Sequence, residues 1–208
     1  MKNVVLVLII SLFCIAGTLP KLSKRKLTDG VSALMPKEFI PMSDDDIALK
    51  YPSTKKPLAM YISPDRVTDF GLNVSKSKFP GGDIKLLSQI YKSTILDAYN
   101  KVSFIQEGVK LVNKREYAVF EYTSEFQGTR KYNYLQYTIV KNQVLIFNFS
   151  TNQSGMQQWQ PIANAMMNSA KIKEGSLKLP EMEQQDRKGK SPQEVLEMQK
   201  TNNPKNKK

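Results

Sequence analysis

The chain has 208 residues, with 31 Lys and Arg against 19 Asp and Glu, one Cys and no His. This length fits one domain with appendages, since a domain usually takes about 100–200 residues. The absence of His excludes a Ser-His-Asp triad and His-bound zinc or haem, and a single Cys excludes an intrachain disulfide or a thiolate metal cluster. The net charge of +12 comes mainly from Lys, whereas base recognition relies on the forked guanidinium of Arg. We therefore expect a solvated basic surface and no nucleic-acid partner.

The N-terminal residues have the pattern of a secretory signal peptide. Lys2 is followed by an apolar run over residues 4–17, which is shorter than the ~20 apolar residues of a membrane-spanning helix. We expect residues 1–17 to be removed and the protein to be exported, to the periplasm or outside the cell. Two alternatives remain open: lipidation of Cys14 in a membrane-anchored lipoprotein, although the bulky Phe13 precedes it, and an uncleaved anchor. Basic residues after the run oppose export of that flank.

Composition divides the remaining chain into three segments. Residues 18–29 are rich in Lys and are interpreted as a basic linker. Residues 30–172 contain the core-forming patterns and are predicted to form one domain. Residues 173–208 have too little apolar content to offset the entropy of ordering, so a disordered Lys-rich tail is predicted there. Its basic end suits an acidic partner or an anionic membrane surface, and the alternative is a tail that only aids solubility.

The first elements of the predicted domain are a strand over residues 31–35 and a short helix from Ser43 to about Lys50. Ser43 is the predicted N-cap, and the acidic residues 44–46 lie near the positive end of the helix dipole. Three consecutive Asp residues can also suggest a calcium or magnesium site. However, the spaced oxygens of a calcium loop are missing, so capping is favoured and no metal site is predicted.

The middle of the chain predicts an antiparallel sheet. Strands are expected over 57–63 and 68–77, then a helix from Asp83 to about Asn100, and then four strands near 102–113, 116–127, 130–140 and 143–151. Turn residues separate the last four strands, which indicates a meander. A final helix carries Trp159 on an apolar stripe, so Trp159 is predicted to anchor that helix to the sheet. The fold class is thus α+β, an antiparallel meander flanked by helices.

Candidate chemistry is sparse. Glu121 and Glu125 lie on one face of a predicted strand and are interpreted as a solvent-facing charged row. The glycines at 81 and 82 are followed by Asp83, which would repel a phosphate at that helix start. We therefore predict no catalytic, cofactor-binding or metal-binding residue and no cofactor.

The order of elements resembles the PsbP/Mog family, whose members include DcrB-like bacterial envelope proteins. The resemblance covers residues 30–172 and is carried by Leu34-Met-Pro-Lys-Glu-Phe39, the central helix, the meander and the closing stretch Trp159–Lys171. It implies an α/β/α sandwich of PsbP/Mog type and a small exported bacterial protein that binds or supports another molecule. The family shares no catalytic residue, so none is carried over.

Two functions from different classes are compatible with these patterns. The first is a non-enzymatic exported envelope protein that acts as a binding or accessory module for an unidentified partner. The second is a periplasmic or cell-surface hydrolase that uses carboxylates; the candidates are Asp65, Asp69, Glu121 and Glu125. A hydrolase would usually supply a His, a nucleophile turn or a convergent acidic cluster, so the sequence favours the first function. The oligomeric state is left open.

Overall fold

The computed structural model describes residues 20–51, 56–79, 81–126 and 128–180. Its centre is an antiparallel sheet of seven strands in the spatial order β3-β4-β5-β9-β8-β7-β6. Along that order the strands are β3 (Ile40–Pro41), β4 (Ala59–Ile62), β5 (Asp69–Lys78), β9 (Gln143–Asn152), β8 (Thr129–Val140), β7 (Arg115–Phe126) and β6 (Asn100–Val112). The predicted four-strand meander is confirmed as β6 to β9.

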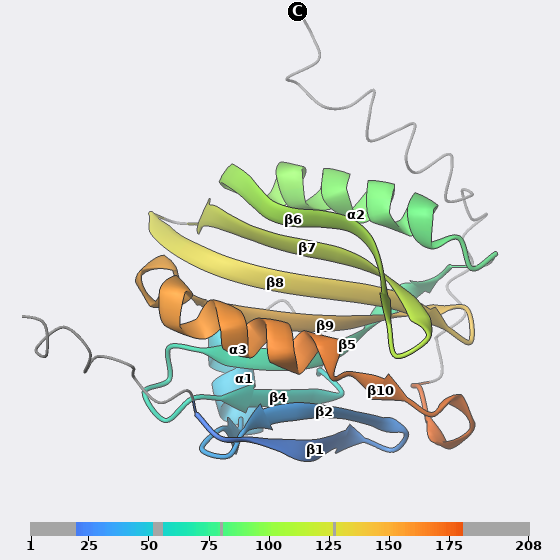
Figure 1. The fold of residues 1–208 in the computed structure, drawn as a ribbon, viewed down its shortest axis with the longest axis horizontal. Coiled ribbons are helices and arrows are strands. Elements are labelled where there is room, and N and C mark those ends of the chain that lie inside the picture. Colours follow the sequence, from blue (N-terminus) through green and yellow to red (C-terminus); the bar gives the residue numbers. More distant parts are fainter. Residues whose placement is uncertain (1–19, 52–55, 80, 127, 181–208) are drawn as a thin grey trace, which may run out of the picture.

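Helices cover both faces of this sheet, which makes the molecule an α/β/α sandwich (Figure 1). On one face, here called the α3 face, lie α3 (Met156–Asn168) and a small sheet. That small sheet contains β1 (Leu22–Thr28), β2 (Val31–Pro36) and β10 (Lys171–Ile172). On the other face, the α2 face, lie α1 (Asp44–Lys50) and α2 (Ile84–Ala98). The predicted fold class is therefore confirmed. Among the described residues, no helix is long and apolar enough to cross a membrane.

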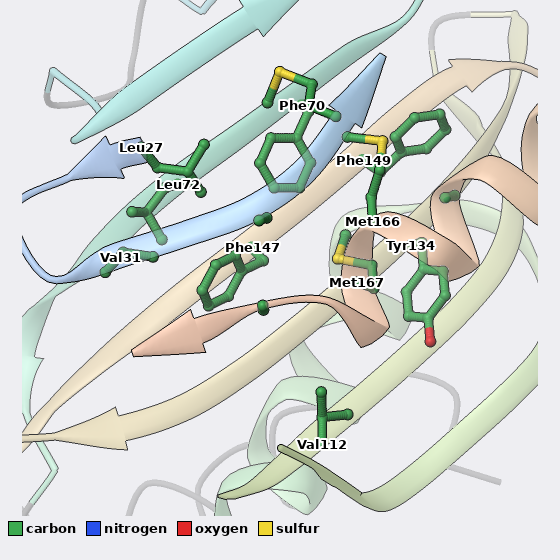
Figure 2. Packing of buried hydrophobic residues seen from close by; sticks show 14 of the residues in the cluster. Leu27, Val31, Phe70, Leu72, Val112, Tyr134, Phe147, Phe149, Met166 and Met167 are labelled. Carbon is green, nitrogen blue, oxygen red and sulfur yellow. The ribbon is translucent and has the colours of Figure 1, made fainter. Parts of the chain in front are cut away.

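The larger core fills the space between the sheet and the α3 face. Alternate residues of β5, β8 and β9 point into it, and α3 contributes Met166 and Met167 (Figure 2). A second core lies under α2, where Ile84, Leu87 and Ile95 meet the opposite sides of the central strands. Tyr91 of α2 stacks on Tyr137 of β8 with ring centroids 4.0 Å apart. Large aromatic rings thus hold both helices on the sheet.

Local signals explain where the elements begin and end. Ser43 accepts a hydrogen bond from the Asp46 N–H at 3.1 Å, and Asp83 accepts one from Leu86 at 2.9 Å, so both predicted N-caps are confirmed. The turns at Asn113-Lys114 and Lys141-Asn142 all have positive φ, as tight hairpins require. Pro161 lies in the second turn of α3, because the helix begins at Met156.

The predicted basic linker over residues 18–29 is wrong for most of its length. Leu22–Thr28 form β1, which pairs antiparallel with β2. The hairpin turn uses Gly30 at φ +84°, and a Cβ there would meet the Lys173 carbonyl at 2.6 Å. Because only one side of this edge strand reaches the core, through Leu27, its Lys-rich sequence is compatible with a strand.

The predicted boundary of the tail at residue 173 is also wrong. Lys173 donates a backbone hydrogen bond to the Gly30 carbonyl at 2.7 Å, and Leu177 is only 2 % exposed within the larger core. Lys141 Nζ donates to the Leu177 carbonyl at 2.9 Å. The packed domain therefore extends to residue 180 at least. The remainder of the predicted tail, like the predicted signal peptide, lies outside the described residues.

Replacing Leu177 by Ala tests this boundary. We expect Leu177→Ala to lower the free energy of unfolding by about 2–4 kcal/mol, as is usual for a buried Leu truncated to Ala. Leu49→Ala is the matched control, since that side chain is 85 % exposed and its loss should change stability by less than about 0.5 kcal/mol. Denaturant unfolding curves that coincide for Leu177→Ala and the wild type would restore the boundary at residue 173.

Candidate functional site

The carboxylates proposed for hydrolysis do not meet at one place. Asp65 lies in an exposed turn, where it accepts hydrogen bonds from the Ser63 hydroxyl and the Val67 N–H. Glu125 pairs with Lys101 at 2.8 Å. Asp69 and Glu121 are both buried, but they lie on opposite faces of the sheet. No group of three or more His, Cys, Asp or Glu side chains that could hold a metal occurs in the described parts of the chain. Cys14 lies outside them.

Glu121 is not the solvent-facing residue that the sequence analysis predicted. It is 3 % exposed and accepts hydrogen bonds from Tyr132 Oη at 2.9 Å and from Gln160 Nε2 at 2.7 Å. On β7 it follows Tyr117 and Val119 at every second position, so the pleat directs it to the same face as these two core residues, the α3 face. Gln160 belongs to α3, and Glu121 therefore links that helix to the central strands. This is a structural arrangement.

Substitution of Glu121 should separate the loss of shape from the loss of hydrogen bonds. We expect Glu121→Ala to lower the free energy of unfolding by about 2–5 kcal/mol, because it leaves the buried Tyr132 hydroxyl and the partly buried Gln160 amide without their acceptor. Glu121→Gln has nearly the same shape and retains an acceptor oxygen, so its loss should be clearly smaller. Thermal unfolding of the two variants makes the comparison, and equal losses would show that the hydrogen bonds contribute little.

The other face of the sheet carries a partly exposed polar array between α1 and α2. We call its members the lysine patch: Lys50, Asp69, Lys131, Asn133, Ser150 and Asn152. The strand register places Asp69 opposite Ser150, Ser150 opposite Asn133, and Lys131 opposite Asn152. All five strand residues lie on the α2 face because they alternate with residues of the larger core. Lys50, the last residue of α1, reaches the same place from the side.

Short hydrogen bonds organise this patch. Lys50 Nζ lies 2.6 Å from Asp69 Oδ2, and Lys131 Nζ donates to Asn152 Oδ1 at 2.8 Å. Ser150 donates to Asn133 at 3.1 Å, and Asn133 donates to Ser124 of β7 at 3.2 Å. A continuous row of polar side chains therefore crosses the sheet from β7 to β5.

Burial and the charges of Lys50 and Asp69 set the electrostatics of the patch. Burial lowers the pKa of Lys131, and the positive charge of Lys50 lowers it further, whereas Asp69 acts in the opposite direction. Burial raises the pKa of Tyr51, next to Lys50, and the charge and hydrogen bonding of Asp69 add to the effect. Two ammonium groups thus share one buried carboxylate. Asn152 also lines a cavity of about 610 Å³ together with Arg130.

A second cavity has a volume of about 460 Å³. Its lining includes Glu38, Asp65 and Trp159. The ring of Trp159 packs against Phe39 and Phe149, with centroids 5.5 and 5.9 Å away, and it contributes to the larger core. The predicted anchoring role agrees with these contacts.

Of the residues of the lysine patch, the sequence patterns point only to Asp69. Lys131 and Asn152 face each other in the β8–β9 hairpin, whereas Lys50 and Asp69 come from distant segments that only the fold brings to this pair. A local signal existed only in β8 and β9, where Asn133, Ser150 and Asn152 occupy alternate positions that face the solvent side. Such polar positions are usual in half-buried strands and carry little information alone.

Comparisons with known proteins show the fold. No protein-family model and no curated protein sequence matches the chain. Among solved structures, it resembles the cyanobacterial PsbP (CyanoP) of Synechocystis, with a TM-score of 0.54 and 13 % identity over 77 % of this chain and 97 % of that one. It also resembles LpqN of Mycobacterium tuberculosis, described as involved in cell envelope biogenesis, with a TM-score of 0.53 and 11 % identity over 73 % and 90 % of the two chains.

A third similar structure is the Ran-binding protein Mog1p of Saccharomyces cerevisiae, with a TM-score of 0.51 and 9 % identity over 74 % of this chain and 96 % of that one. The superpositions cover nearly the whole length of each of these three proteins. The chain therefore has the PsbP/Mog-type fold that the resemblance implied. At such low identity the likeness concerns the fold alone.

Proposed function

We propose that this chain is a non-enzymatic, exported envelope protein that acts as a binding or accessory module for a protein partner. The proposal rests on one contrast between two sets of polar side chains: three of the carboxylates considered for hydrolysis have local or structural roles, and the lysine patch is partly exposed. Asp65, Glu121 and Glu125 are all engaged in local or structural hydrogen bonds. The lysine patch instead offers a partly exposed row of donors and acceptors that suits recognition better than proton transfer.

The fold is consistent with this proposal, because similar structures include a protein described as Ran-binding and one described as involved in envelope biogenesis. Two properties of catalytic sites are also missing from the described residues. They contain no convergent acidic cluster, and His is absent from the entire sequence. The hydrolase is the alternative, and Asp69 is its strongest candidate because it is buried beside Lys50.

Export can be tested by mass spectrometry of the native protein after cell fractionation. We expect a chain that starts after residue 16 or 17 in the exported fraction, since the apolar run suits a signal peptidase. A lipid-modified Cys14 at the N-terminus would favour the lipoprotein alternative. An intact Met1 on a soluble cytoplasmic protein would contradict export.

Binding can be tested by affinity capture from the native envelope with the full chain and with a Lys131→Gln variant. We expect a defined partner to be retained by the wild type and reduced with the variant, while a panel of hydrolase substrates remains unchanged by the purified protein. Turnover of any substrate that is abolished in Asp69→Asn, and retained in Glu125→Gln, would support the hydrolase instead.

A further inference from the structure

We propose that the lysine patch binds an acidic segment of the partner protein, in an extended conformation across strands β7, β8, β9 and β5. This inference rests on the proposed binding function and names the chemistry of the ligand. It starts from the charges. Lys50 and Lys131 lie close enough for their charges to interact, and the single carboxylate of Asp69, which pairs with Lys50, leaves an excess of one positive charge among these three groups. The patch consequently attracts a further carboxylate.

Hydrogen-bonding capacity supports the same ligand. An ammonium group has three N–H donors, and Lys131 makes one hydrogen bond in the described part of the chain, to Asn152. Lys131 is half-buried, which restricts the orientation of its ammonium group. Its two remaining N–H donors could therefore form directed hydrogen bonds to a ligand. A carboxylate can accept both of these hydrogen bonds, and charge-assisted bonds of this kind are about twice as strong as neutral ones.

The extent of the polar row distinguishes a peptide from a small anion. From β7 to β5 the row crosses three strand spacings, or about 14 Å at about 4.8 Å each. About four residues of an extended chain cover this distance. Farther along the same face, Asn73 donates to Asn148 at 3.2 Å, so the row of amides continues beyond Ser150. Side-chain amides offer both donors and acceptors to a peptide backbone, whereas a single oxyanion would engage only the two lysines.

The low pKa of Lys131 indicates that its charge is not needed for folding. Because the pKa in the folded state lies below the ordinary value, the unfolded chain binds this proton more tightly, and the charged lysine opposes folding at neutral pH. Lys131→Gln should therefore fold with unchanged or slightly higher stability.

The test is a titration of the isotope-labelled full chain with a hexaglutamate peptide, followed by NMR at low and at high salt. We expect saturable shifts at Lys131, Asn133 and Ser150, and about tenfold weaker binding by Lys131→Gln, as for the loss of one hydrogen bond to a charged group. Lys171→Gln is the matched control, since this exposed lysine lies on the small sheet across the molecule. Asn133→Asp should also weaken binding, and raised salt should weaken it for the wild type.

Four results would overturn the inference. Shifts that map elsewhere, or equal losses in Lys131→Gln and Lys171→Gln, would exclude the patch. Inorganic phosphate that binds as tightly as the peptide would make it a small-anion site. Vesicles with phosphatidylglycerol that bind in a Lys131-dependent manner, without peptide binding, would make it a membrane contact. A native partner that is captured equally by wild type and Lys131→Gln would refute the inference while the proposed binding function stands, whereas no captured partner would refute that function.

Discussion

Between pH 10 and pH 12 the protein should lose most of its stability, because its tyrosines are buried. Burial raises the pKa of Tyr91, Tyr117 and Tyr134 to about 12, two units above the ordinary value of about 10. Above pH 10 the unfolded chain releases these protons while the folded chain keeps them. Folding stability is therefore fully present below pH 10 and falls as the pH rises. Three such groups contribute about 8 kcal/mol of loss by pH 12, comparable with the total stability of a domain.

The measurement is a pH titration that follows tyrosinate absorbance and circular dichroism together. We expect the ionisation of the buried tyrosines and the loss of ellipticity to occur together in one steep step, since a buried phenol ionises only when the chain unfolds. Tyr134→Phe is the informative variant. Its hydroxyl is buried without a hydrogen-bond partner among the described residues, so its removal should not destabilise the protein at pH 7 and should move the alkaline step to higher pH. Absorbance that rises near pH 10 before any loss of ellipticity would show that the rings are accessible.

The central sheet could be predicted from sequence because its local signals agree with its tertiary structure. Strands β7 to β9 have aromatic residues at alternate positions. Asn and Lys at residues 113–114 and 141–142, and Gly128 between β7 and β8, adopt the positive φ that the hairpins need. The N-caps Ser43 and Asp83 act within three residues of themselves. In these segments the pattern, the turn chemistry and the packing all specify the same structure.

The two ends of the domain were mispredicted because their composition obscured their packing. The strand β1 contains Lys24, Arg25 and Lys26, yet Asp29-Gly30 after it is a hairpin dipeptide that indicates a strand pair. Leu177 is an isolated apolar residue in a polar stretch, and its burial depends on a hairpin about 150 residues earlier in the chain. Composition averages over a window, and it cannot detect one side chain that fills a gap.

The candidate site was harder to predict than the fold. Tyr117, Val119 and Glu121 occupy every second position of β7, which places all three on the core face. A carboxylate is rarely buried, so the charge of Glu121 obscures this periodicity. The partners of Glu121 come from β8 and α3, and those of Asp69 come from α1. Side-chain pairs between distant segments leave no periodic signal in the sequence. Only the structure therefore shows that Glu121 has a structural role and that Asp69 belongs to the lysine patch.

Trp159→Ala should lower the free energy of unfolding by about 3–5 kcal/mol, which is typical for a large aromatic side chain removed from a core. The indole lies between Phe39, before β3, and Phe149 of β9, with tilted ring pairs at 5.5 and 5.9 Å. These contacts fix the first turns of α3 to the sheet, and Gln160, the next residue, then reaches Glu121. Loss of the ring should therefore loosen the helix at the same end as the buried carboxylate.

Trp159→Phe is the matched control, because a smaller ring preserves part of the aromatic contact and should lose clearly less stability. Trp159 also lines the cavity of about 460 Å³ beside Glu38 and Asp65, so a role in ligand stacking makes a competing prediction. If the ring served a ligand, Trp159→Ala would leave the unfolding transition unchanged and reduce binding. If it anchors α3, the variant will unfold at lower denaturant concentration. Amide hydrogen exchange will then be faster in residues 156–163 than in α2, because α2 has a core of its own.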